Sequence, residues 1–198
     1  MNGEAVTAET VAPPIAGGCF VAVVGQSGAG KDSLIAYARQ RLSDDPGFCF
    51  PRRVITRDPH AVEDHDTLTE DEFATAEADG RFALAWAAHG LRYGIPALVD
   101  DHVRAGGVVV ANLSRSVLAQ VSRRYARPLV VEVTARPNVI AARLAARGRE
   151  SDEDIAARMQ RQVAIDRMRW TVHRIDNSGN LDAAGDVLLR VLKAQLRA

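Results

Sequence analysis

The sequence predicts an α/β domain in which a central, mainly parallel sheet is flanked by helices. Three observations support this prediction. The chain has 198 residues, 47% of them hydrophobic, which suits one domain with a sizeable core. From Cys19 onward, short apolar runs alternate with amphipathic segments, a pattern typical of β-α units. A glycine-rich turn joins the first apolar run directly to the first helical pattern.

The N-terminal half begins with the clearest elements. A buried strand at 20–24 leads through the glycine-rich turn into a helix at 31–42. A second strand at 53–56 leads into a polar, loop-like stretch at 57–66.

A small excursion from the main sheet is expected next. Thr69 followed by Glu72 forms a capping box, which predicts a short helix ending near residue 79. Residues 81–88 and 91–95 alternate around a His-Gly turn and predict two antiparallel strands. The remaining expected elements are strands at 108–112, 129–133 and 172–176, and helices at 96–105, 115–124, 137–146, 152–168 and 182–196.

Composition excludes several classes of function. Lys+Arg 25 and Asp+Glu 25 give zero net charge, which argues against a protein held to nucleic acid or to an anionic membrane by its overall field. The apolar runs are far shorter than the roughly 20 residues that a membrane-spanning helix needs. Cys19 and Cys49 have no zinc-site spacing and are too few for a disulfide framework, so we expect buried thiols.

The N-terminal segment differs from the rest of the chain. Residues 1–17 have neither the basic region nor the apolar segment of a secretion signal. We therefore expect a disordered tail at 1–17 on a cytoplasmic protein, followed by a single domain at 18–198.

The strongest motif lies between the first strand and the first helix. It has the GxxxxGK spacing of a phosphate-binding loop, or P-loop, in its required strand-loop-helix context. Glycines let the backbone N–H groups point inward, and the lysine ammonium reaches the β- and γ-phosphates of a nucleotide. The expected nucleotide-binding residues are Gly25, Gln26, Ser27, Gly28, Ala29, Gly30, Lys31, Asp32 and Ser33.

One position departs from the usual motif. The residue after Lys31 is normally Ser or Thr, whose hydroxyl binds Mg²⁺, but here it is Asp32. A carboxylate is also a suitable ligand for a hard cation. Two interpretations remain open: Asp32 binds Mg²⁺, or it caps the helix while Ser33 or water serves the metal.

Taken with its neighbours, the loop resembles that of the guanylate-kinase branch of the nucleoside monophosphate kinases. It is more similar still to the ribose 1,5-bisphosphate phosphokinases of the phosphonate pathway, which usually have GKDSL at this point. The resemblance extends over nearly all of the chain from residue 19. The matching segments are 30–34, 54–57, 63–65, 68–73, Trp86, 89–90, 93–94, 112–115, 147–150 and Arg158.

The resemblance implies a P-loop nucleotide kinase fold with an acceptor-binding region at about 52–95 and a helical lid at about 147–158. It also implies roles for single residues. Arg57 matches the arginine that grips the acceptor phosphate, and Tyr93 matches a phosphate-contacting tyrosine. Arg147 and Arg158 match lid arginines that close over the donor phosphates. Further implied contacts are Asn177 near the adenine, Asn112 on the substrate, and Glu63 and His65 on a substrate hydroxyl or a metal. Support is weaker for Arg53 on the acceptor phosphate and for Arg149 at the transition state.

Both carboxylates that read guanine in guanylate kinases are missing. The run after residue 81 is Phe82-Ala83-Leu84-Ala85, and the strand end near 112 reads Ala-Asn-Leu. A site that recognises a base edge loses discrimination steeply without its hydrogen-bond partners. GMP is therefore disfavoured as the acceptor.

The resemblance implies that ATP, with Mg²⁺, phosphorylates ribose 1,5-bisphosphate to 5-phospho-α-D-ribose 1-diphosphate (PRPP) and ADP. An acceptor phosphate is already ionised at neutral pH, so no general base is required, and the sequence offers no clear one. Two alternatives stay open: a guanylate or other nucleoside monophosphate kinase, and a noncatalytic guanylate-kinase-like interaction module. Each arginine also has a simpler interpretation as a solvated surface residue.

Overall fold

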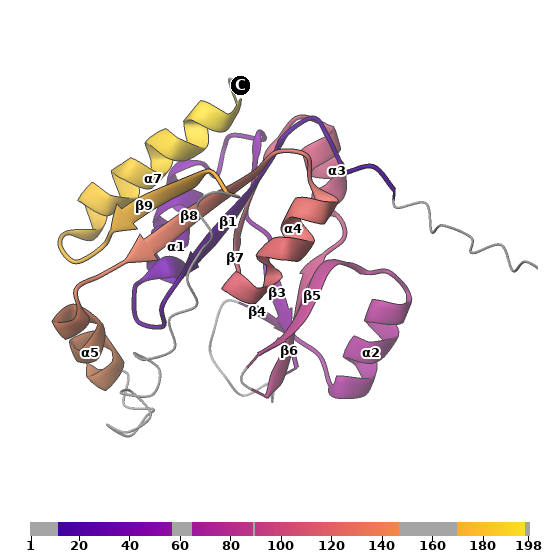
Figure 1. Ribbon diagram of the computed structural model, residues 1–198, viewed down its shortest axis with the longest axis horizontal. Coiled ribbons are helices and arrows are strands. Elements are labelled where there is room, and N and C mark those ends of the chain that lie inside the picture. The colour runs from indigo at the N-terminus through magenta and orange to yellow at the C-terminus, as the bar shows by residue number, and fades with distance from the viewer. Residues whose placement is uncertain (1–11, 57–64, 89, 147–169, 197–198) are drawn as a thin grey trace, which may run out of the picture.

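A five-stranded parallel sheet forms the centre of the computed structural model, which describes residues 12–56, 65–88, 90–146 and 170–196 (Figure 1). The strand order is β2-β7-β1-β8-β9, and every neighbouring pair is parallel. The predicted mainly parallel sheet is confirmed. The strands are β1 (Cys19–Gly25), β2 (Phe48–Cys49), β7 (Val108–Asn112), β8 (Pro128–Thr134) and β9 (Val172–Asp176).

Helices cover both faces of this sheet, which explains why β1 is apolar throughout. Val21 and Val23 face the side covered by α1 (Lys31–Arg41) and α7 (Leu181–Leu196). Phe20, Ala22 and Val24 face the side of α3 and α4. These two helices span Val99–Arg104 and Leu118–Arg124, and a 3-10 turn, η1 (Arg115–Val117), precedes α4.

A second, smaller sheet projects beside the first and is flanked by α2 (Glu70–Ala78). The expected antiparallel pair at its edge is confirmed, although the sheet also contains two further strands. Its order is β4-β3-β6-β5, with β3 at Arg53–Ile55, β4 at His65–Thr67, β5 at Phe82–Ala88 and β6 at Leu91–Pro96.

The predicted capping box begins α2. The Thr69 N–H donates to Glu72 Oε2 at 2.8 Å, and the Glu72 N–H donates to Thr69 Oγ1 at 3.3 Å. Hydrogen bonds from Thr69 hold the pKa of Glu72 below its ordinary value. This local signal located the helix start correctly.

Several boundaries differ from the sequence prediction. Ile15 pairs in parallel with Tyr125, with its N–H 2.7 Å from the Arg124 carbonyl oxygen. The structured domain therefore extends on the N-terminal side of the expected boundary at residue 18.

Of the two cysteines expected to be buried, Cys19 is buried, and this burial raises the pKa of its thiol to about 11. Cys49 is only partly buried, contrary to expectation.

The last element before the expected lid is α5 (Pro137–Ala146). The predicted helix at 152–168, the lid at 147–158 and most of the polar stretch at 57–66 lie outside the described residues. Within the described part of the chain, no helix combines the length and apolar character needed to cross a bilayer.

Candidate active site

The P-loop connects β1 to α1 and bends through two left-handed glycines. Gly28 has a φ of 79° and Gly30 a φ of 89°, conformations that favour glycine. A Cβ atom on Gly30 would lie 2.3 Å from Asn177 Nδ2. Any residue other than glycine would therefore strain the loop backbone at these two positions, and at Gly30 its side chain would also collide with Asn177.

Two side chains from later segments of the chain brace the loop, one directly after β9 and one on α5. Asn177, with 2% of its surface exposed, donates from Nδ2 to the Ala29 carbonyl oxygen at 2.9 Å. Arg143 on α5 donates to the Asn177 carbonyl oxygen at 2.9 Å and to the Ala29 carbonyl oxygen at 3.4 Å. The Asn177 amide nitrogen thus braces the loop, and the expected place of Asn177 near the adenine stays a prediction. Arg143 was not found by sequence reasoning.

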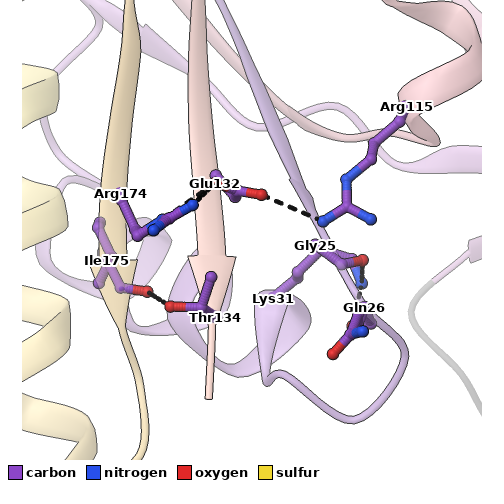
Figure 2. Close-up of polar contacts among 8 residues, drawn as sticks. All are labelled: Gly25, Gln26, Lys31, Arg115, Glu132, Thr134, Arg174 and Ile175. Atoms are coloured by element: carbon purple, nitrogen blue, oxygen red, sulfur yellow. Dashed lines mark hydrogen bonds and ion pairs between the residues drawn. The ribbon is translucent and has the colours of Figure 1, made fainter. Parts of the chain in front are cut away.

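Lys31 lies at the start of α1 and folds across the loop. Its Nζ donates to the carbonyl oxygens of Gly25 at 2.9 Å and Gln26 at 3.0 Å (Figure 2). The ammonium is therefore held at the mouth of the loop, where the motif predicts contact with nucleotide phosphates.

Asp32 contacts two neighbouring elements. Asn112, at the buried end of β7, donates from Nδ2 to Asp32 Oδ1 at 2.6 Å, and an Arg53 guanidinium nitrogen lies 3.6 Å from the same oxygen. Neither contact involves Oδ2. The Asn112 amide thus contacts the carboxylate that is a candidate metal ligand, and its expected contact with the substrate stays a prediction.

A cavity of about 440 Å³ opens beside the loop, between the two sheets. We call it the P-loop cavity. It contains three cationic side chains and one acidic side chain, so its charge suits a phosphorylated ligand. Its lining residues are Gly25, Gln26, Ser27, Lys31, Asp32, Arg53, Trp86, Ala88, Tyr93, Asn112, Leu113, Ser114, Arg115 and Ser116. Of the two candidate metal ligands, Asp32 is among them and Ser33 is not.

An aromatic pair forms part of the cavity wall on the smaller sheet. Trp86 on β5 stacks against Tyr93 on β6, with ring centroids 5.3 Å apart and planes inclined by 12°. Tyr93 was expected at the substrate. Both rings reach the cavity, because the two residues are register partners on one face of the antiparallel pair.

Sequence reasoning also missed a charged cluster at the carboxyl end of the central sheet. Glu132 on β8 is buried and lies between Arg115 and Arg174, which approach it from opposite sides (Figure 2). Arg115 also lines the P-loop cavity. No local motif marks this cluster, because its members come from three separate segments of the chain.

Several predicted site residues cannot be placed relative to the cavity. Arg57, Glu63, Arg147, Arg149 and Arg158 lie outside the described residues. For His65, only its backbone position in β4 is described.

Comparisons with known proteins show which proteins this chain is similar to. The chain is 53% identical over 176 residues to the ribose 1,5-bisphosphate phosphokinase PhnN of Brucella melitensis, covering 88% of this chain and 92% of that protein. It is 52% identical over 176 residues to the protein of the same name from Pseudofrankia inefficax, covering 88% of this chain and 90% of that protein.

Among solved structures, guanylate kinase from Anaplasma phagocytophilum has a similar fold. The TM-score is 0.67 at 14% sequence identity, with 92% of this chain and 88% of that chain covered. This likeness confirms the P-loop kinase fold. No protein-family model matches the chain. At 53% identity over most of both sequences, the chain belongs to the ribose 1,5-bisphosphate phosphokinase family.

Proposed function

We propose that this protein transfers the γ-phosphoryl group of ATP to the 1-phosphate of ribose 1,5-bisphosphate, giving PRPP and ADP. The observation that carries the proposal is its high identity to relatives named for phosphorylation of that bisphosphate. The cytoplasmic location expected from the sequence belongs to the same proposal.

The chemistry of the P-loop cavity supports a phosphorylated sugar as the acceptor. Lys31, Arg53 and Arg115 supply positive charge, and Asp32 is the one acidic residue among the lining residues of the described chain. Leu113 is buried, as are Ala83 and Leu84, near the positions where guanylate kinases carry base-reading carboxylates. The described cavity wall thus lacks those carboxylates.

Phosphoryl transfer depends mainly on positioning and on neutralising charge. In the proposed mechanism, the loop amides and Lys31 hold the β- and γ-phosphates of ATP. Arg53 and Arg57 hold the acceptor phosphate, and Tyr93 contacts it. Arg147 and Arg158 neutralise the donor phosphates from the lid, while Glu63 and His65 contact the sugar. No proton has to leave the attacking phosphate oxygen.

The residues of the site fit a magnesium ion. Mg²⁺ is usually bound by one or two carboxylates together with phosphate oxygens and water. Asp32 lines the cavity, and within the described part of the chain both of its contacts use Oδ1, which leaves Oδ2 for a cation. Among the described residues, no group of three or more acidic, histidine or cysteine side chains could hold a metal. When bound, Mg²⁺ would neutralise charge on the ATP phosphates.

Replacing Asp32 with alanine is expected to raise the Mg²⁺ concentration for half-maximal rate. The increase should be about 10-fold or more, because removing even a residue that only orients a metal ligand typically lowers metal affinity by that factor. Initial rates across a Mg²⁺ titration measure it. Ser33→Ala is the matched comparison, and a shift with Ser33→Ala but none with Asp32→Ala would assign the metal to Ser33.

A coupled assay of ADP release tests the choice of acceptor. We expect rapid turnover with ribose 1,5-bisphosphate and little with GMP or AMP, because the described cavity has no acidic base-reading contact. Robust turnover of GMP with none of the bisphosphate would instead identify a nucleoside monophosphate kinase. No turnover with any of the three would favour a noncatalytic module.

A further inference from the structure

Arg115 is a cavity residue to which the proposed mechanism assigns no role. It is the first residue of η1, directly after the turn that follows β7, and its side chain is 15% exposed. From there the side chain extends toward Glu132 and the end of β1 (Figure 2). It lines the P-loop cavity together with Gly25, Gln26 and Lys31.

The Glu132 carboxylate fixes the orientation of this guanidinium. Arg115 donates from one terminal nitrogen to Glu132 Oε1 at 3.2 Å. Arg174 donates to the other oxygen, Oε2, through two nitrogens at 3.1 and 3.0 Å. The Glu132 side chain is only 10% exposed, so these charge-assisted bonds form largely away from water.

This arrangement leaves donors on Arg115 for another partner. A guanidinium has five N–H groups, and the carboxylate takes one of them from Arg115. The Arg115 Nε is buried and has no hydrogen-bond partner within the described structure. The three side chains together carry one net positive charge, because two guanidinium groups surround one carboxylate. The cluster can therefore attract an anion even though it contains Glu132.

The register of the central sheet places the net positive charge of this cluster where the P-loop begins. Glu132 on β8 is paired with Val24 on β1, and the following residue, Gly25, accepts the hydrogen bond from Lys31. Arg115 follows β7, on the other side of β1, and so its side chain reaches across the end of β1 to contact β8. Lys31, Arg115 and Arg53 thus line one cavity at the mouth of the loop.

We propose that Arg115 binds the acceptor phosphate that receives the transferred group, and that Glu132 is a positioning residue acting through Arg115. In the reaction, the bond between the γ-phosphorus and the bridging oxygen of ADP breaks, and a bond forms from that phosphorus to an oxygen of the acceptor phosphate. Arg115 neither gives nor takes a proton. It offsets the repulsion between two ionised phosphates as they approach, and its fixed orientation avoids reorganisation during transfer.

The proposal rests on the proposed function only in requiring a phosphate as acceptor. A phosphate that receives the group is common to ribose 1,5-bisphosphate and to every nucleoside monophosphate. The experiment is therefore performed with whichever acceptor the wild-type protein uses. If that acceptor is GMP, the proposed sugar substrate is wrong while the role of Arg115 is still tested. If the wild-type protein transfers to no acceptor phosphate, both proposals fail.

The test measures kcat and both KM values for Arg115→Ala. We expect kcat to fall by roughly 100-fold or more, in line with the loss of one preorganised transition-state contact. The KM for ATP should change by no more than about two-fold, because Arg115 is proposed to contact the acceptor phosphate and not the bound ATP. Arg115→Lys should recover part of kcat, since it restores the charge without the planar fork.

Three outcomes would overturn the proposal. A higher acceptor KM at unchanged kcat would show that Arg115 stabilises the bound acceptor and the transition state equally, so that it does not offset the repulsion during transfer. A higher KM for ATP alone would place it on the donor. Lower thermal stability with normal kinetics would leave it a structural ion-pair partner. Arg115→Ala should still fold, because Arg174 continues to pair with Glu132.

Arg174→Ala is the matched control. It removes a guanidinium from the same carboxylate, but Arg174 is 56% exposed and does not line the P-loop cavity. We expect a much smaller loss of kcat than with Arg115→Ala, and equal losses would contradict the assignment. A double-mutant cycle tests whether Glu132 acts through Arg115. Glu132→Gln should lower kcat in the wild-type protein but should cause no further loss of kcat in the Arg115→Ala variant. Independent, additive losses would separate Glu132 from Arg115.

Discussion

Replacing Lys31 with arginine is expected to reduce kcat/KM by roughly 100-fold or more, although the positive charge is kept. The ammonium lies 2.9 and 3.0 Å from the carbonyl oxygens of Gly25 and Gln26, inside the turn of the loop. A compact point charge fits that space, whereas a planar guanidinium fork is wider and directs its donors differently. Steady-state kinetics with ATP and the acceptor measure the loss.

The chain provides a matched control for this substitution. Lysine occurs only at positions 31 and 193, and arginine supplies the remaining 23 basic residues. Lys193 is exposed on α7, so Lys193→Arg should leave kcat/KM unchanged. Near-normal activity in Lys31→Arg would contradict the assignment of the loop lysine. A chain that uses arginine almost everywhere else keeps a lysine at this one functional position.

Replacing Gly30 with alanine is expected to destabilise the protein and to disable the loop. Its φ of 89° is a left-handed conformation that costs other residues about 1–3 kcal/mol. The new Cβ would also lie 2.3 Å from Asn177 Nδ2, which displaces the side chain that braces Ala29. We therefore expect a lower free energy of unfolding in urea together with a higher KM for ATP.

Gly80→Ala separates these two effects. Gly80 has a φ of 69°, and no atom lies within 4 Å of an added Cβ. Alanine there should incur only the backbone strain, with no change in the KM for ATP. If Gly30→Ala lowered the free energy of unfolding no more than Gly80→Ala and left KM unchanged, Asn177 would not be bracing the loop.

Local signals explain which parts of the fold the sequence could predict. The P-loop is a contiguous motif between a buried strand and a helix, and the capping box at Thr69 joins residues three positions apart. Both features could therefore be predicted from the sequence. Strands β2 and β4 have two and three residues, too few to show a hydrophobic period, and they are defined only by their pairing with β7 and β3.

The parts of the site that the sequence did not reveal depend on distant pairing. Asn177 and Ala29 are 148 residues apart, and they meet because β9 ends beside the loop. Arg115 and Glu132 are separated by 17 residues, and in the sheet β1 lies between β7, which precedes Arg115, and β8, which contains Glu132. Glutamate in an otherwise apolar β8 was a usable signal, since a carboxylate at a buried strand position requires a cationic partner.

Direct observation of the product by phosphorus NMR tests the central claim most directly. The wild-type protein would be incubated with ATP, Mg²⁺ and an equimolar mixture of ribose 1,5-bisphosphate and GMP. The account predicts loss of the sugar 1-phosphate signal, appearance of a coupled diphosphate pair on the sugar, and formation of ADP, while GMP persists. Formation of GDP with the bisphosphate unchanged would contradict it.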